Sequence, residues 1–213
     1  MRANAEESRH AALLVQDASE RIRRVIACHR RAAARLTAEA AHELRTSVLR
    51  LLAADKVLRS LCGWRLLGKQ ARRIRKLRRL LGPLRDLQVI RRHFASLELQ
   101  TSFAGAFLAR LQRRRAKKAE AVAKAALAAF SPERLRRRLR TATQANLRRG
   151  KLLPAVPGLL DKLYQRILDR RKDAIVRGDD EALHALRARL KRYRYALELL
   201  PPGASMIATE VAS

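Results

Sequence analysis

The sequence predicts an all-α protein, built as a helical bundle of two pseudo-repeated halves. Alanine, leucine and arginine, which favour helices, dominate the chain of 213 residues. Glycine and proline, which mark turns, number only 8 and 6. No stretch alternates apolar and polar residues for long enough to indicate a strand. The short connections between helical stretches are typical of antiparallel neighbours in a bundle.

Helix breakers and apolar spacing define the predicted elements. Gly-Pro at 82–83 separates two helices, and Ser-Pro-Glu at 131–133 is typical of a helix start. Gly-Asp-Asp at 178–180 ends one helix and caps the next. The predicted helices span residues 8–36, 39–61, 64–81, 84–98, 103–129, 132–149, 158–177 and 180–200. We expect a single domain over residues 1–200 and a flexible tail over 201–213.

The charge of the chain indicates a polyanionic partner. Its 49 lysines and arginines outnumber 19 aspartates and glutamates, which gives a formal charge of +30. Hydrophobic residues make up 48 %, so the composition is not that of a disordered chain. Such an excess destabilises the fold by self-repulsion unless an anion neutralises it. The candidate anions are nucleic acid, an anionic membrane surface and a chain of phosphates.

Two further features bear on location. No stretch approaches the ~18 apolar residues of a membrane span, and no signal peptide is visible. The two cysteines, Cys28 and Cys62, lie 34 residues apart and match no zinc-binding spacing. Reduced thiols of this kind are typical of a cytoplasmic protein, which is the location we expect.

The predicted helix over 64–81 is strongly two-faced. Eleven basic residues and no acid lie between Lys56 and Arg85. At 100° per residue, five basic side chains fall within an arc of about 80°. We call these residues the basic ridge: Arg65, Lys69, Arg72, Lys76 and Arg79. The opposite side is the predicted core face, formed by Leu67, Ala71, Ile74, Leu77 and Leu81. Solvated helix faces usually mix both signs of charge, so this ridge favours a ligand-facing role.

An internal repeat carries the most specific pattern. The segment His-Glu-Leu-Arg at 42–45 recurs as His-Ala-Leu-Arg at 184–187, 142 residues later, and Arg50 then aligns with Arg192. In the second copy one side of the helix is predicted to carry His184, Arg187, Lys191, Arg194 and Tyr195. The other side, predicted as core, carries Leu186, Leu190, Tyr193, Leu197 and Leu200. Two such copies indicate one shared, pseudo-symmetric site.

These segments resemble the CHAD domain family, the histidine α-helical domain. The family pattern is a His-x-x-Arg helix, a basic helix and a Gly-x-x-Arg-Asp-x-Asp-Val segment, which this chain matches at 42–45, 71–79 and 82–89. The second copy, at 183–198, is closer still. The resemblance implies two helical halves around a basic channel that binds inorganic polyphosphate, and association with polyphosphate granules.

The chain also departs from the family pattern. Leu49 and Leu52 stand where the first half usually has basic residues, and Gln88 stands where an aspartate is usual. Only thirteen residues follow Leu200, so the second half is expected to be truncated, with apolar surface left for self-association into a homo-oligomer.

We therefore expect a polyphosphate-binding protein that is not an enzyme and needs no cofactor or metal. The resemblance and the shared helix faces assign the ligand to His42, Arg45, Arg50, Lys56, Arg72, Lys76, Arg79, His184, Arg187, Lys191, Arg192 and Arg194. Arginine forks and lysine point charges suit phosphate oxygens. Non-specific nucleic-acid binding is the alternative, although aromatic residues for stacking make up only 4 %. A phosphatase or kinase would need a Glu-x-Glu-x-Lys strand, a P-loop or an aspartate cluster, and the sequence contains none of these.

Overall fold

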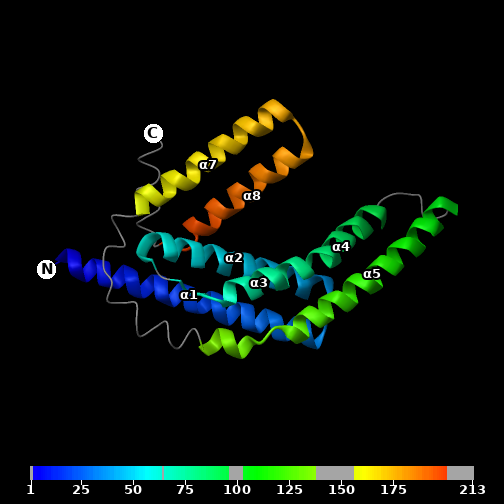
Figure 1. The fold of residues 1–213 in the computed structure, drawn as a ribbon, viewed down its shortest axis with the longest axis horizontal. Coiled ribbons are helices and arrows are strands. Elements are labelled where there is room, and N and C mark those ends of the chain that lie inside the picture. The colour runs from blue at the N-terminus through cyan, green and yellow to red at the C-terminus, as the bar shows by residue number, and fades with distance from the viewer. Residues whose placement is uncertain (1, 64, 96–102, 138–155, 201–213) are drawn as a thin grey trace. The chain divides into compact units, whose positions relative to one another are not determined.

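A computed structural model describes residues 2–63, 65–95, 103–137 and 156–200, and within these ranges all regular structure is helical (Figure 1). The all-α prediction is confirmed. The helices are α1 (Arg2–Ala34), α2 (Ala38–Cys62), α3 (Gln70–Leu80), α4 (Gly82–Ala95), α5 (Phe103–Ala129), α7 (Val156–Arg177) and α8 (Asp180–Leu197). Residues 132–137 are also helical, while the remainder of the predicted helix 132–149 and the predicted tail 201–213 lie outside the described residues.

The predicted helix 64–81 begins later than expected, and its start has a physical cause. Gly63 and Gly68 have φ of 68° and 50°, which end α2 and postpone α3. Between them, the buried Asp55 carboxylate accepts a hydrogen bond of 2.8 Å from the Leu67 amide. The break predicted at 82–83 is shorter than expected, since Leu81 alone separates α3 from α4.

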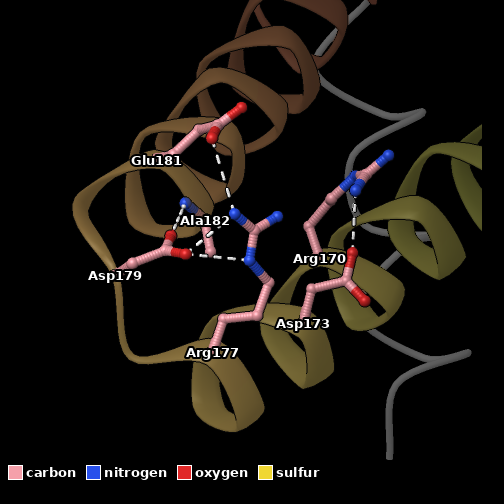
Figure 2. Close-up of polar contacts among 6 residues, drawn as sticks. All are labelled: Arg170, Asp173, Arg177, Asp179, Glu181 and Ala182. Carbon is pink, nitrogen blue, oxygen red and sulfur yellow. Dashed lines mark hydrogen bonds and ion pairs between the residues drawn. The ribbon is translucent and has the colours of Figure 1, made fainter.

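The described residues group into two compact units, and the long helices α1 and α2 contribute to both. Among the described residues, the first unit takes those that fall within 1–21, 50–67 and 137–213, and its main feature is the antiparallel α7–α8 hairpin (Figure 1). The turn of this hairpin uses Gly178, whose φ is 62°. Asp179 then caps α8 by accepting from the Ala182 amide at 2.7 Å. Figure 2 shows Arg177 bridging Asp179 and Glu181, at 2.8 and 3.4 Å.

The second unit contains residues 22–49 and 68–136. Its buried side chains include His29, whose Nε2 donates to the Leu127 carbonyl at 3.0 Å while the ring lies 5.1 Å from that of Phe130. Thr37 caps α2, since its Oγ1 accepts from the Ala40 amide at 3.1 Å. No helix that the structure describes is long and apolar enough to cross a membrane.

Candidate functional site

Five cations gather in the first unit, and we call them the cationic cluster. They are Lys56 on α2, Arg166 and Arg170 on α7, and Arg189 and Arg192 on α8. Residues four apart on α7 and three apart on α8 lie on one side of each helix. The turn at Gly178 then folds α8 back against α7, which brings the two pairs to neighbouring helices.

Lys56 lies among the positive charges of this cluster. Burial is the largest cause that lowers the pKa of its ammonium group below 10.5, and Arg166, Arg192, Arg189 and Arg59 add to the effect in that order. Each of these causes disfavours the charged form. The free protein therefore holds a partly buried positive charge among other positive charges.

Arg189 reports the same surroundings from α8. Its pKa is lowered by burial first, and then by Arg192, Arg170 and Arg166. A groove of about 320 Å³ runs along the α7–α8 hairpin beside this residue, and Arg170 and Arg192 also line it. Arg170 has a partner, because its Nη1 lies 2.7 Å from an oxygen of Asp173, as Figure 2 shows. An anion with several oxygens, such as a phosphate chain, would relieve the repulsion that remains.

A second cation pair in the same unit surrounds one carboxylate. Arg50 and Arg194 each place Nε near an oxygen of Glu198, at 3.4 and 3.3 Å. Both guanidinium groups also lie over the ring of Tyr195, at 5.8 and 5.1 Å from its centroid. Tyr195 is only 4 % exposed, so its predicted place on the exposed stripe of α8 is wrong.

The other predicted residues of α8 lie in a different direction from the cationic cluster. His184, Arg187 and Lys191 are exposed. Lys191 lies seven residues after His184, which is two turns along the same side, whereas Arg192 is rotated from Lys191 by about 100°. The predicted core face is also wrong in part, since Leu190 is 46 % exposed.

The second unit holds the remaining predicted residues. Arg72, Lys76 and Arg79 are exposed on α3, while the core face predicted for this segment, including Ala71, Ile74 and Leu77, is buried. His42 is exposed on α2. Arg45 is half-buried, and its Nη1 donates to the Arg78 carbonyl at 3.2 Å. A Cβ at Gly82 would lie 3.2 Å from the same Nη1, so the arginine side chain would have to shift by a few tenths of an ångström to admit it.

The structure thus brings together some of the predicted residues and adds others. Lys56 and Arg192 share the cationic cluster, and Arg50 and Arg194 share Glu198. Arg166, Arg170 and Arg189 were not among the predicted residues, although a basic pair spaced i, i+4 on the helix before the repeat was a signal for the first two. A role in ligand binding stays a prediction for every residue of the set. Within the described ranges, no group of three or more His, Cys, Asp or Glu side chains could hold a metal ion.

Comparison with known proteins supports the family resemblance. The model of the CHAD domain family matches residues 9–211. The crystal structure of the CHAD domain from the plant Ricinus communis superposes with a TM-score of 0.65 at 25 % sequence identity. The match covers 89 % of this chain and 65 % of that chain, so this chain spans about two thirds of the plant structure. No curated protein matches the sequence.

Proposed function

The chain belongs to the CHAD domain family, and from this premise we propose that it binds inorganic polyphosphate through the cationic cluster. One observation carries the proposal: Lys56 is held partly buried among Arg166, Arg189 and Arg192, so that its own pKa is lowered. Positive charges held close together destabilise the free protein. A bound anion would remove that repulsion, so such a cluster is typical of an anion-binding site. The packing of α2, α7 and α8 concentrates positive charge at this site.

The chemistry of the cluster suits a phosphate chain. Each internal phosphate carries about one negative charge, and guanidinium forks grip its oxygens with paired, charge-assisted hydrogen bonds. The groove beside Arg189 runs along two helices, which fits a linear ligand better than a compact one. The exposed His184, Arg187 and Lys191 can hold further phosphates along the edge of α8.

We propose a binding role without catalysis, in the cytoplasm and at polyphosphate granules. Polyphosphate hydrolysis or transfer commonly needs carboxylates that hold Mg²⁺. Two acids, Asp173 and Glu181, line the groove beside the cluster, and each is already paired, with Arg170 and with Arg177. Non-specific binding of nucleic acid remains the competing function, and it would rest on charge alone.

A binding titration with long-chain polyphosphate at physiological salt tests the proposal. The test variant is Arg189→Gln with Arg192→Gln, and the control is Arg113→Gln with Arg114→Gln. Each variant removes two positive charges. Arg113 and Arg114 are exposed on α5, so the control changes no buried contact. We expect the test variant to weaken binding at least tenfold more than the control does. Equal losses would mean that only net charge matters, and the proposed site would be wrong.

A further inference from the structure

Glu198, the residue that caps the C-terminus of α8, lies between two arginines of the first unit. Its carboxylate oxygens lie 3.4 Å from Nε of Arg50 on α2 and 3.3 Å from Nε of Arg194 on α8. Both guanidinium groups also lie over the ring of Tyr195. We call these four residues the Glu198 site. Among the described residues neither arginine pairs with another acid, so two positive charges flank one negative charge.

Both ion pairs at this site are loose. Charge-assisted hydrogen bonds between a guanidinium group and a carboxylate are about 2.7–2.9 Å long, which is shorter than either distance here. The side chains are also open to solvent, with 47 % of Arg50, 60 % of Arg194 and 33 % of Glu198 exposed. Exposed ion pairs of this kind are weak, so an anion from solution can compete with Glu198 for both arginines.

The backbone of Glu198 is held independently of its side chain. Its carbonyl oxygen accepts a hydrogen bond of 3.2 Å from Nη2 of Arg21 on α1, and its amide donates to the Arg194 carbonyl at 2.9 Å. The next two residues, Leu199 and Leu200, are buried. The carboxylate of Glu198 can therefore rotate into solvent while the end of α8 stays in place.

The Glu198 site is distinct from the cationic cluster but lies on two of the same helices. Lys56 follows Arg50 by six residues, which is about 9 Å along α2 and about 120° around it. Arg192 precedes Arg194 by two residues, which is about 3 Å along α8 and about 160° around it. A phosphate chain that occupies the cationic cluster therefore has a second pair of arginines nearby, and a carboxylate of the protein itself occupies that pair.

We propose that Glu198 is an internal competitor for phosphate: its carboxylate occupies an anion-binding site between Arg50 and Arg194, and a phosphate group displaces it on binding. The inference rests on the proposed function, because it assigns the Glu198 site to phosphate groups of the same ligand class. A phosphate group offers more oxygens than one carboxylate, so both guanidinium groups can form paired hydrogen bonds with it. Its entry breaks two ion pairs, so Glu198 lowers the affinity of the site.

Calorimetric titration with inorganic tripolyphosphate compares the wild type with Glu198→Gln. Glutamine keeps the shape of the side chain but removes its charge, so we expect about three- to tenfold tighter binding. The control is Asp180→Asn, which removes the same charge from an exposed residue about 27 Å earlier along α8 and should change the affinity less than about twofold. Unchanged or weaker binding by Glu198→Gln would overturn the inference, because the carboxylate would then position the arginines instead of competing with phosphate.

A second background shows whether the gain comes from the Glu198 site. In the variant Arg50→Gln with Arg194→Gln, the further change Glu198→Gln should leave the affinity for tripolyphosphate unchanged, because no arginine pair remains for it to release. An equal gain in both backgrounds would contradict the inference, since the gain would then follow from net charge alone.

NMR spectroscopy of the wild-type chain provides a test without a variant. Saturating tripolyphosphate should shift the side-chain carboxyl signal of Glu198 and the Nε–H signals of Arg50 and Arg194. If tripolyphosphate binds and the Glu198 signal stays in place, the inference is wrong while the proposed function stands. If neither tripolyphosphate nor long-chain polyphosphate binds, the proposed function is wrong and this inference with it.

Discussion

Replacing Lys56 by methionine should make the free protein more stable and its ligand binding weaker. The methionine side chain keeps most of the aliphatic volume of lysine but removes the partly buried charge whose pKa is lowered. Each exposed charge pair contributes about 0.2–1 kcal/mol. Relief from Arg166 and Arg192, the two arginines that lower the pKa of Lys56 most, should therefore stabilise the fold by about 1 kcal/mol. For a protein of this size that gain raises the melting temperature by about 2–4 °C.

The stability gained by Lys56→Met should depend on pH, and this dependence checks that the gain comes from the charge of Lys56. Because the pKa of Lys56 is lower in the folded state than 10.5, the unfolded chain binds more protons at pH values between the two. The wild-type protein therefore gains stability from Lys56 as the pH rises through its lowered pKa. The advantage of Lys56→Met should be largest near pH 7 and should shrink toward pH 10.5.

Thermal unfolding followed by circular dichroism measures both effects, with Lys118→Met as the matched control. Lys118 is exposed on α5, and its loss removes the same single charge. Polyphosphate should stabilise the wild type more than the Lys56 variant, since a ligand that binds the folded state raises its stability by mass action. If the Lys56 variant melts below the wild type at pH 7, or no higher than the control, then repulsion between Lys56 and the neighbouring arginines does not destabilise the folded protein, and the reasoning is refuted.

Three further predictions concern the elements that position the cluster, and thermal unfolding measures each. Gly178→Ala should cost about 1–2 kcal/mol, because φ at this turn is 62° and an alanine there is strained; an unchanged melting temperature would contradict this. Asp179→Ala should lower the melting temperature at neutral pH, because the Ala182 amide loses its acceptor. That amide is also the first cause of the lowered pKa of Asp179, so the difference should disappear well below pH 3.8; a difference that persists there would contradict the capping role. Asp55→Ala should cost about 1–3 kcal/mol by leaving the buried Leu67 amide unpaired, whereas Asp55→Asn should retain most of the stability; equal losses would contradict this role.

The sequence was sufficient to predict the parts of the fold that local chemistry decides. The core face of α3 follows from the spacing of Ala71, Ile74 and Leu77, and the cap of α8 follows from the order of Gly178 and Asp179. In both cases a few neighbouring residues determine the outcome, so helical periodicity and capping rules were enough.

Features that depend on distant neighbours were predicted less well. Which arc of α8 is buried depends on the helices that cover it, so Tyr195 is buried and Leu190 is exposed against expectation. The cationic cluster joins Lys56 to Arg166 and Arg189 from three helices, and no spacing within one helix specifies that meeting. The segment before α3, where Gly63 and Gly68 postpone the helix, also makes a contact that no local pattern specifies, the bond from the Leu67 amide to Asp55.

A competition between long-chain polyphosphate and duplex DNA, at equal phosphate concentration and physiological salt, tests the central claim most directly. Duplex DNA is about 20 Å wide and must lie on an outer surface. There its contacts are screened over a Debye length of about 8 Å. A thin phosphate chain can instead reach the partly buried charges around Lys56, where screening is weaker. We predict that polyphosphate displaces DNA and that DNA does not displace polyphosphate. Displacement of polyphosphate by DNA would contradict the account and would assign the cationic surface to nucleic acid.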